Sequence, residues 1–462
     1  MDIQDAYNLT HNGILALARA ERQGIRVDMK HAQDKHRELT RLIDELNSEF
    51  IRTKFYKYWE KSRGGRKVNI GSNQQLASYL YATKKIKPIK ETESGQGSTD
   101  EEALEALGIP ELNNLLRIRK LKKLRDTYLH SFISESVDGI LHPVFNLHMA
   151  RTYRSSSDSP NFQNIPIRDE EAKEIVRTCL YPRKGYQLLE IDFSGLEVCI
   201  AACYHKDPTM IKYIKDPKSD MHADMAKQIF LVDDFDKKKK AYKALRFAAK
   251  NGFVFPQFYG DYYANNVISL SGLTGLPLKG KYKSGDGLEL PDGNHLGHHL
   301  ISKGIKSVND FTNHLKKIES HFWRKRFPVY ANWKKKWWAQ YQKIGSFDMY
   351  TGFHCSGVMG KNDAINYPVQ GAAFHCLLWS FIQLDKLMIE ERWKTRLVGQ
   401  IHDSILFDVK PKELPHILES AKKVTEENLP KAWDWINVPL LIDAELCEVD
   451  QSWYYKKEID LT

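Results

Sequence analysis

Two aspartates follow short apolar runs and are the residues best placed to carry out chemistry. Asp192 ends the run LLEI, where a strand-like pattern changes to a helical one. Asp403 stands with His402 and Ser404 between the apolar runs LVGQI and ILFDV, which predict a hairpin with its turn at these residues. A buried carboxylate without a partner would cost several kcal/mol. Each aspartate is therefore expected at an exposed turn or beside a cation.

Considered together, the two aspartates indicate a metal site. Carboxylates at neighbouring strand ends can hold two divalent ions roughly 3.5–4 Å apart, the arrangement that serves in-line phosphoryl transfer. Magnesium requires few protein carboxylates, because water and substrate phosphate oxygens complete its coordination. Considered singly, Asp192 is also explained as a helix cap and Asp403 as an ordinary turn residue.

The segment 237–250 is strongly cationic and forms a second candidate site. Lys239, Lys243, Arg246 and Lys250 recur at helical spacing, close to one face. A stripe of cations suits a triphosphate, whose charge of about −4 needs several positioned cations. Aromatic residues follow at 253–263 and suit base stacking, although core packing explains them as well. A solvated helix face is the alternative for the lysine run.

Two further segments carry polar groups suited to nucleic acid. The loop RTYRSSSDSPNFQNIP, 151–166, combines arginine, hydroxyl and amide groups that can contact phosphate, sugar and minor-groove acceptors. The segment NYPVQG, 366–371, starts an apolar helix with Asn366 and Gln370 four residues apart. The three histidines of HLGHH, 295–299, lack an acidic or cysteine partner at ligand spacing, so no metal site is predicted there.

The composition sets limits on the class of protein. A chain of 462 residues with 42% hydrophobic residues can bury two or three cores. Its net charge of +10 favours an anionic partner, with nucleic acid ahead of an acidic membrane surface. The sequence has no run of 18 apolar residues and no signal-peptide pattern. The six cysteines form no CxxC pair, which indicates a reducing compartment.

Apolar periodicity predicts the elements that must position these residues. Helices are expected over 12–47, 112–132 and 322–343. A further helix is expected to begin just after Ser98 or Thr99, one of which would cap it. A strand followed by a helix is expected over 186–205. The stretch 265–310 is rich in Gly, His and Lys and is interpreted as a surface insertion.

The order of these motifs resembles the polymerase region of family A DNA polymerases, the bacterial DNA polymerase I class. DFSGLE (192–197), RFAAKNGFVFPQFYG (246–260) and QIHDS (400–404) are similar to motifs A, B and C of that family. The segments 152–166 and 366–371 resemble two further family motifs. The resemblance runs from about residue 12 to the C-terminus.

The resemblance implies an α+β right-hand polymerase fold, with an antiparallel palm sheet and helical fingers and thumb. Residues 1–140 would form the N-terminal lead and thumb, 141–208 and 366–462 the palm, and 209–365 the fingers, with the insertion at about 265–310. Asp192 and Asp403 would be the catalytic residues and bind two Mg²⁺ ions, with Mn²⁺ as a substitute.

The resemblance also implies roles in substrate binding. Glu197 with Tyr259 would crowd the sugar 2′ position and exclude ribonucleotides, and Tyr259 would lie at the templating position. The residues implied in dNTP binding are Arg246, Lys250, Phe255, Tyr259, Glu197 and His222. Those implied in primer and template binding are Arg154, Asn366, Gln370, His402 and Asn164.

The function implied is a DNA-templated DNA polymerase that extends a primer 3′-OH with dNTPs. Its partners would be primed DNA and dNTPs, with any processivity factor unknown. The protein is expected to be a monomer that does not bind a membrane. The cytoplasm is the expected location, that of a bacterial host if a phage encodes the chain, which the unusual motif B favours. No proofreading or 5′-nuclease domain is expected in this chain. The alternatives are a single-subunit RNA polymerase, against which Glu197 argues, and a DNA-binding homologue without catalysis.

The chain departs from the family pattern at several positions. Motif B holds one residue more between Lys250 and Tyr259, so either Val254 or Phe255 could take the sugar-stacking position. Phe255 is favoured, with a helix bulge or break at Pro256. Elsewhere Ser404 replaces the usual Glu, Gly195 the usual Gln, Tyr153 the usual Gly, and Asn362 stands where an Arg is common. Activity with altered fidelity is therefore expected.

Overall fold

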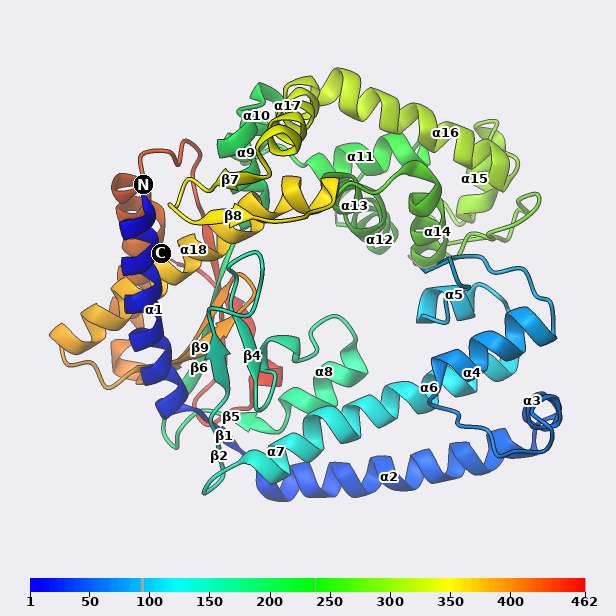
Figure 1. Cartoon of the computed structure of the whole chain (residues 1–462), viewed down its shortest axis with the longest axis horizontal. Helices are drawn as coiled ribbons and strands as arrows, with labels where there is room; N and C mark the ends of the chain where they lie inside the picture. The colour runs from blue at the N-terminus through cyan, green and yellow to red at the C-terminus, as the bar shows by residue number, and fades with distance from the viewer. Residues whose placement is uncertain (93–94, 237, 462) are drawn as a thin grey trace. The chain divides into compact units, whose positions relative to one another are not determined.

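The computed structural model describes residues 1–92, 95–236 and 238–461 (Figure 1), so Lys237 of the cationic segment lies outside the described residues. The chain splits into two compact units. The sheet-bearing unit comprises residues 1–51, 117–204 and 337–462, and the helical unit comprises 52–116 and 205–336. Helices α6 (Pro110–Lys123) and α17 (Pro328–Ile344) cross the division. The finer division into thumb, palm and fingers stays a prediction.

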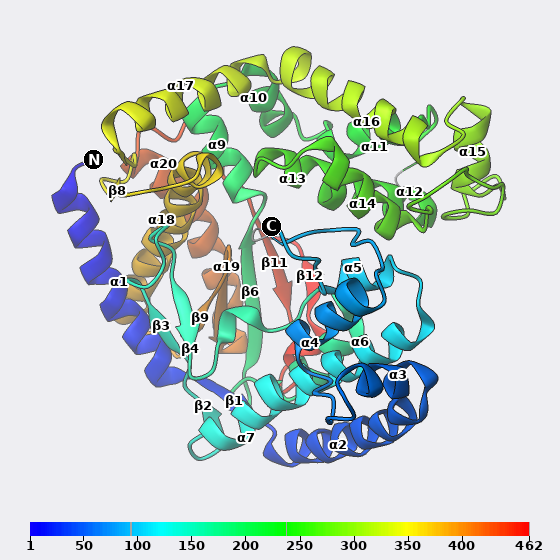
Figure 2. The same cartoon turned by 45° about the vertical axis from the view of Figure 1, so that its right-hand side comes forward.

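A five-stranded antiparallel sheet forms the centre of the sheet-bearing unit (Figure 2), with strand order β12-β11-β6-β10-β9. All residues of β6 are buried except Asp192, which explains why this strand reads as a nearly continuous apolar run. The strands are β6 (Gln187–Phe193), β9 (Arg396–Ile401), β10 (Ser404–Val409), β11 (Ile442–Leu446) and β12 (Lys457–Ile459). The predicted hairpin and the antiparallel sheet are thus confirmed.

Three smaller antiparallel sheets complete the strands of this unit. The prediction of one helix over 12–47 was wrong, because a short strand of one of these sheets divides that stretch. Gly24 ends the first helix with φ 62°, and Ile25–Val27 then pairs with strands on both sides. The sheets are β2-β1-β5 (Ile140–Leu141, Ile25–Val27, Leu180–Tyr181), β3-β4 (Val144–Asn146, Ser156–Asp158) and β7-β8 (Ser346–Asp348, His354–Ser356).

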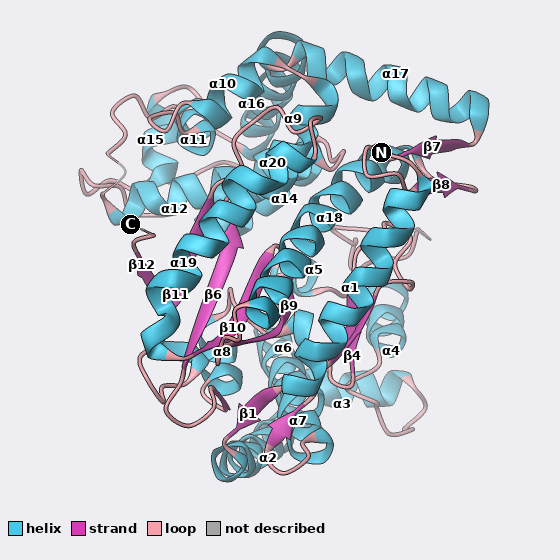
Figure 3. Ribbon diagram, turned by 90° about the vertical axis from the view of Figure 1, so that its left-hand side faces the viewer, coloured by secondary structure: helices cyan, strands magenta, loops and turns pink. Residues whose placement is uncertain are grey.

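Helices α1 (Ile3–Gln23) and α18 (Lys361–Glu390) pack on the sheet from one face (Figure 3), α1 against β9 and α18 against β9 and β10. They approach closely at Gly13, where a Cβ would lie 2.9 Å from Leu378 Cδ2. Among the described residues α18 alone is long and apolar enough to cross a membrane, but most of its apolar stretch is buried inside the protein. A core helix of a folded unit has the same properties, and we interpret α18 as one.

The remaining helices of this unit are short apart from α2. The stretch predicted as a helix over 112–132 is helical throughout, because α6, a π-helical turn and α7 follow one another. The helices are α1 (Ile3–Gln23), α2 (Met29–Arg52), η2 (Leu124–Leu129), α7 (His130–Glu135), η3 (Phe162–Asn164), α8 (Glu170–Arg177), α9 (Leu196–His205), α18 (Lys361–Glu390), η6 (Pro411–Glu413), α19 (Leu414–Lys422), η7 (Lys423–Asn428), α20 (Leu429–Ala432) and η8 (Trp453–Tyr455).

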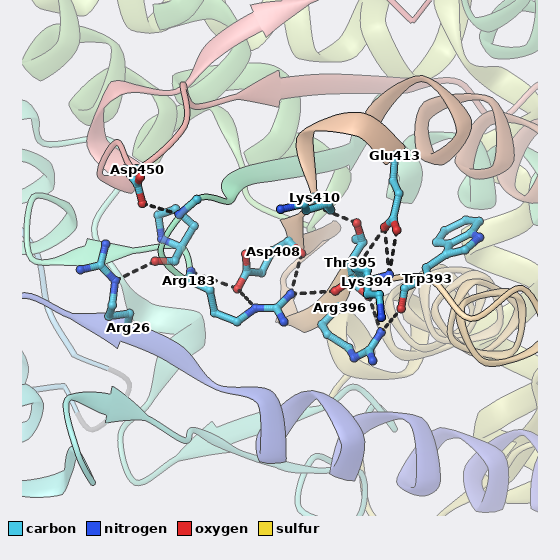
Figure 4. Close-up of polar contacts among 12 residues, drawn as sticks. Arg26, Arg183, Trp393, Lys394, Thr395, Arg396, Asp408, Lys410, Glu413 and Asp450 are labelled. Carbon is cyan, nitrogen blue, oxygen red and sulfur yellow. Dashed lines mark hydrogen bonds and ion pairs between the residues drawn. The ribbon is translucent and has the colours of Figure 1, made fainter.

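A polar cluster holds the ends of β9 and β10 that lie away from the hairpin turn (Figure 4). The buried carboxylate of Asp408 accepts hydrogen bonds from Arg183, from Nε at 2.7 Å and from the backbone N–H at 3.1 Å. Glu413 accepts the backbone N–H groups of Lys394 and Thr395, both at 2.9 Å or less. Charge-assisted hydrogen bonds of this kind are stronger than neutral ones. They fix the strands whose other ends lead to Asp403.

The helical unit contains no named strand within the described ranges, and α11, α12, α14 and α16 pack together in it (Figures 1 and 2). Buried Asp207 joins two of its helices: its carboxylate accepts the backbone N–H of Thr209 at the start of α10 and that of Tyr330 in α17, each at 3.0 Å. The helices are α3 (Lys54–Ser62), α4 (Asn73–Ala77), η1 (Ser78–Thr83), α5 (Glu101–Glu105), α10 (Pro208–Lys215), α11 (Met221–Phe230), α12 (Lys240–Ala249), η4 (Lys250–Val254), α13 (Phe255–Phe258), α14 (Tyr263–Thr274), α15 (Leu296–Ser302), α16 (Val308–His321) and η5 (Phe322–Arg326).

One detail of this unit differs from expectation. The N-cap of α5 is Asp100, whose carboxylate accepts the Ala103 N–H at 2.8 Å, rather than Ser98 or Thr99. The stretch 265–310, interpreted from the sequence as a surface insertion, begins inside α14 and contains α15.

The histidines of HLGHH have separate polar partners. His299 Nε2 lies 3.1 Å from the Phe230 carbonyl oxygen, and His295 Nδ1 lies 2.8 Å from that of Gly287. His299 therefore anchors the stretch to the end of α11. The described residues contain no group of three or more His, Cys, Asp or Glu side chains arranged to hold a metal ion.

Candidate active site

The sheet places Asp192, near the end of β6, next to the hairpin turn that carries Asp403 just before β10. Ser404, the residue after Asp403, is the direct cross-strand partner of Asp192. The Phe193 N–H donates to the Asp403 carbonyl oxygen at 3.2 Å, which ties the end of β6 to the hairpin turn. His402 adopts a left-handed conformation in this turn, with φ 53°. The pairing of β6 with β10 thus brings together two aspartates that are distant in sequence.

Both carboxyl groups hold their protons more tightly than usual. The surrounding protein raises the pKa of Asp192 to about 7, and the negative charge of Asp403 adds to this effect. Burial raises the pKa of Asp403 to about 6, with a further contribution from Glu197, while Arg154 opposes the rise. Like charges held close together disfavour ionisation. A divalent cation would relieve this repulsion, so the donor set fits a hard metal ion with oxygen ligands.

Arg154 is the cation beside this carboxylate group. Its Nη1 donates to Glu197 Oε1 at 3.1 Å, and its Nη2 lies 3.7 Å from Asp403 Oδ1. The loop 151–166 therefore meets the first turn of α9 and the hairpin turn at one place. Three residues singled out in the sequence, each from a different motif, are in contact.

The structure adds a residue near this site that the sequence reasoning missed. Asp443 of β11 is the cross-strand partner of Asp192 on the side opposite Ser404, and it accepts a hydrogen bond from the Ser194 hydroxyl. In the segment Ile442–Leu446 apolar and polar residues alternate in the sequence, and Ile442 and Ala444 are buried while Asp443 is exposed. This alternation was a signal for a strand with Asp443 on its polar face. The pairing partner could not be read from the sequence.

The residues expected to contact primer and template lie around the hairpin and α18. His402 is exposed at the turn, but the protein around its ring removes part of the ring's solvation, and this effect together with the Arg154 charge lowers the pKa of His402. Asn366 and Gln370 are half-buried, one turn apart in α18, with Pro368 inside the helix between them. Asn164 is exposed, and its carbonyl oxygen accepts a hydrogen bond from the Tyr128 hydroxyl at 2.6 Å.

Tyr153, which replaces the usual glycine, is held from two sides. Its φ of 56° is left-handed, a conformation that costs a non-glycine residue about 1 kcal/mol or more. Its hydroxyl donates to the His354 carbonyl oxygen at 2.6 Å, and its own carbonyl oxygen lies 3.2 Å from His375 Nε2. These contacts fix the backbone next to Arg154.

In the helical unit a π-helical turn accommodates the extra residue of motif B. Residues Lys250–Val254 form this turn between α12 and α13, and Pro256 lies in the first turn of α13. A π-bulge inserts one residue into a helix without ending it. The bulge predicted near the proline is confirmed.

The bulge gives Val254 and Phe255 different surroundings. Val254 is fully buried in the core. Phe255 is partly accessible, with Lys250 Nζ 5.1 Å from its ring centre and the His222 ring 5.6 Å away at a near-perpendicular angle. Phe255, rather than Val254, therefore lies beside two other residues expected to bind the nucleotide. The sugar-stacking role favoured for Phe255 from the sequence stays a prediction.

The charged residues around His222 also lie close to one another. Arg246 Nε donates to Asp220 at 2.8 Å, and Asp220 caps the helix that carries His222. Burial and the neighbouring Lys250 and Arg246 lower the pKa of His222 to about 4, so its ring is neutral near pH 7. Cations and a neutral hydrogen-bonding ring on one surface suit a polyphosphate.

Tyr259 follows α13 and is 42% exposed. The helix before it is held by Lys334, whose Nζ donates to the carbonyl oxygens of Gln257 and Phe258 at 3.2 and 3.1 Å. Lys334 also lies 4.0 Å from the centre of the Trp323 ring. A lysine at a helix C-terminus interacts favourably with the helix dipole. The backbone immediately before Tyr259 is thus held in place.

Comparisons with known proteins agree on one family. The sequence model of DNA polymerase family A matches residues 36–263 and 318–454, which leaves 264–317 unmatched. DNA polymerase I of Bacillus subtilis is 27% identical over 454 residues, covering 96% of this chain and 45% of that protein. The DNA polymerase of Bacillus phage SP01 is 25% identical over 425 residues, covering 85% of this chain and 41% of that protein. The chain spans less than half the length of these relatives.

The solved structures give the same answer for the fold. The POL domain of Pol1 from M. smegmatis, in complex with DNA primer-template and dNTP, aligns with a TM-score of 0.72 at 23% identity, covering 96% of this chain and 70% of that chain. The α+β polymerase fold expected from the sequence is thereby confirmed. Because the family model matches most of its length, this chain belongs to DNA polymerase family A.

Proposed function

We propose that this chain is a DNA-templated DNA polymerase that extends a primer 3′-OH with dNTPs by two-metal-ion nucleotidyl transfer. The observation that carries the proposal is the strand register that places Asp403 beside Asp192, with a mutual repulsion that a cation would relieve. Membership of family A supports the choice of DNA synthesis.

Asp192 and Asp403 would hold two Mg²⁺ ions, for which Mn²⁺ could substitute. Bound metal would lower the pKa of the primer 3′-OH and neutralise charge on the phosphates. The side chains of the protein would contribute by holding the substrate in position. Arg246 and Lys250 would bind the triphosphate, and His222 would assist them as a neutral donor.

Several side chains would check the sugar and the base. Phe255 would stack on the sugar, and Glu197 with Tyr259 would exclude a 2′-hydroxyl. In the sheet-bearing unit, Arg154, Asn366 and Gln370 would contact minor-groove acceptors, which every correct base pair offers. His402 and Asn164 would support the primer and template strands.

The protein would act as a monomer on primed DNA in the cytoplasm, that of a bacterial host if a phage encodes it. We assign residues 1–140 to the N-terminal lead and thumb, 141–208 and 366–462 to the palm, and 209–365 to the fingers. Binding to duplex should weaken steeply with salt, because phosphate contacts release counterions.

Primer extension tests this proposal directly. The wild type and Asp403→Ala are incubated with primed template and Mg²⁺, with dNTPs and rNTPs in separate reactions. The proposal requires extension with dNTPs by the wild type and none by the variant. Robust extension with rNTPs would favour an RNA polymerase instead. Equal extension by both proteins would refute the metal assignment, and no extension by either would indicate a homologue without catalysis.

A further inference from the structure

A buried ionic cluster lies on the same face of the sheet as the candidate metal site. Glu190 and Asp192 are two residues apart in β6, so their side chains point to one face. Across β11, Glu190 is paired with Glu445 just as Asp192 is paired with Asp443. Like charges directly opposite each other destabilise a sheet unless a cation lies between them.

Lys456 is the cation that lies between Glu190 and Glu445. Its Nζ lies 2.7 Å from Glu190 Oε2 and also contacts Glu445. Its side chain is 5% exposed, and that of Glu190 is 7% exposed. Trp453 Nε1 donates to the same Glu190 oxygen at 3.0 Å, and the Arg177 guanidinium lies 3.8 Å away. A buried carboxylate with such partners has one fixed position.

The second oxygen of Glu190 faces the catalytic hairpin. The Ser404 hydroxyl lies 3.2 Å from Glu190 Oε1 and 3.0 Å from the Ile401 carbonyl oxygen. Ser404 is 4% exposed, follows Asp403 and is the strand partner of Asp192. Glu190 therefore links the C-terminal residues Trp453 and Lys456 to the turn that carries Asp403.

We infer that Glu190 is a positioning residue for nucleotidyl transfer, which holds the Asp403 turn in register with Asp192 through the Ser404 hydroxyl. Ser404 stands where the family usually has glutamate, and here the nearby carboxylate comes from the neighbouring strand instead. The inference rests on the proposed function and adds a residue to its site. A two-residue turn with His402 in a left-handed conformation needs such an anchor.

The test compares single-nucleotide incorporation by the wild type, Glu190→Ala, Glu190→Gln, Ser404→Ala and the double variant Glu190→Ala/Ser404→Ala. Glu190→Ala should lower kcat about 10- to 100-fold, as a misplaced reacting group does, with Kd for primed DNA and KM for dNTP nearly unchanged. Glutamine keeps the shape and a polar contact to Ser404, so Glu190→Gln should recover most of the rate. Because Glu190→Ala and Ser404→Ala break the same Glu190–Ser404 contact, the double variant should be no slower than Glu190→Ala.

Glu445→Gln provides the matched control. Glu445 shares Lys456 with Glu190, but no contact between Glu445 and the hairpin is recorded among the described residues. Its substitution should lower the melting temperature slightly and leave kcat within about twofold, because the Glu445 side chain is 42% exposed and its ion pair is partly screened by solvent.

Three results would overturn the inference. They are an equal loss of kcat in Glu445→Gln and Glu190→Ala, losses that multiply in the double variant, or a Glu190→Ala protein that is less stable but fully active. If Glu190→Ala does not fold, Ser404→Ala decides the matter, since an unchanged kcat in that variant would also refute the inference. A wild type that extends no primer would refute the proposed function instead, so the two failures are distinguishable.

Discussion

The carboxylate of Glu197 is bound to the Arg154 guanidinium, with 3.1 Å between Oε1 and Nη1. The same guanidinium lies 3.7 Å from Asp403. One arginine therefore connects the residue expected to reject ribonucleotides with a residue expected to bind metal. Glu197 would be held against the sugar by this contact rather than by its own rotamer preference.

Shortening Glu197 should relax sugar selection. In Glu197→Ala the 2′ position gains room and Arg154 is released toward Asp403. We expect the ratio of kcat/KM for rNTP to that for dNTP to rise at least about tenfold, which corresponds to about 1.4 kcal/mol. Steady-state incorporation of matched dCTP and CTP opposite a template guanine measures this ratio.

Glu197→Gln separates size from charge in that experiment. Glutamine fills nearly the same volume, so it should keep most of the discrimination, although its contact with Arg154 is weaker. If the alanine variant discriminates as well as the wild type, Glu197 does not contact the sugar.

The neighbouring residues Val254 and Phe255 should respond to substitution in opposite ways. Phe255→Ala removes a partly accessible ring beside Lys250 and His222, so we expect KM for dNTP to rise about tenfold with little change in melting temperature. Val254→Ala creates a small cavity in the core and should cost about 1–3 kcal/mol of stability, with KM for dNTP unchanged. Nucleotide titrations and thermal melts on both variants provide the comparison.

The opposite pattern would show that the extra residue of motif B is accommodated differently in solution. In that case Val254 would stack on the sugar and Phe255 would belong to the core.

His375 should make stability depend on pH. It is buried next to the Phe353 ring, with Nδ1 2.7 Å from the Thr351 hydroxyl and Nε2 3.2 Å from the Tyr153 carbonyl oxygen. Burial lowers its pKa to about 3 in the folded protein, against about 6.5 when unfolded. The unfolded chain thus takes up a proton first, and stability is lost as the pH falls from about 6.5 toward 3.

Replacing the histidine should remove this contribution. Between pH 7 and pH 5 the wild type should lose about 2 kcal/mol more than His375→Gln does, from one proton taken up only on unfolding. Urea unfolding followed by tryptophan fluorescence at both pH values measures the difference. Parallel losses in the two proteins would mean that His375 is protonated in the folded state.

Much of the site could be predicted from the sequence because its signals are local. The apolar runs around Asp192 and Asp403 require buried strands, and a carboxylate near the end of such a strand is expected to be accessible. The extra residue between Lys250 and Tyr259 required a local change in the helix, and the π-helical turn provides it. In both cases the information lies within about ten residues.

The parts that could not be predicted depend on pairing between distant segments. Glu190 reads as one polar residue in an apolar strand, and only the fold shows that Lys456, far along the chain, neutralises it. Asp443 likewise becomes relevant only through the register of β11 with β6. The strand at Ile25–Val27 was missed because its partners are short and lie more than a hundred residues away. Periodicity within one segment contains no information on such partners.

The most direct test of the whole account is the rate of single-nucleotide incorporation by Asp192→Asn at saturating primed DNA, dNTP and Mg²⁺. Asparagine keeps the shape of the side chain and removes the charge that would bind metal. The account predicts a loss of at least about 10³-fold in rate, equivalent to about 4 kcal/mol of transition-state stabilisation, with DNA affinity retained. A variant that incorporates the nucleotide at the wild-type rate would contradict it.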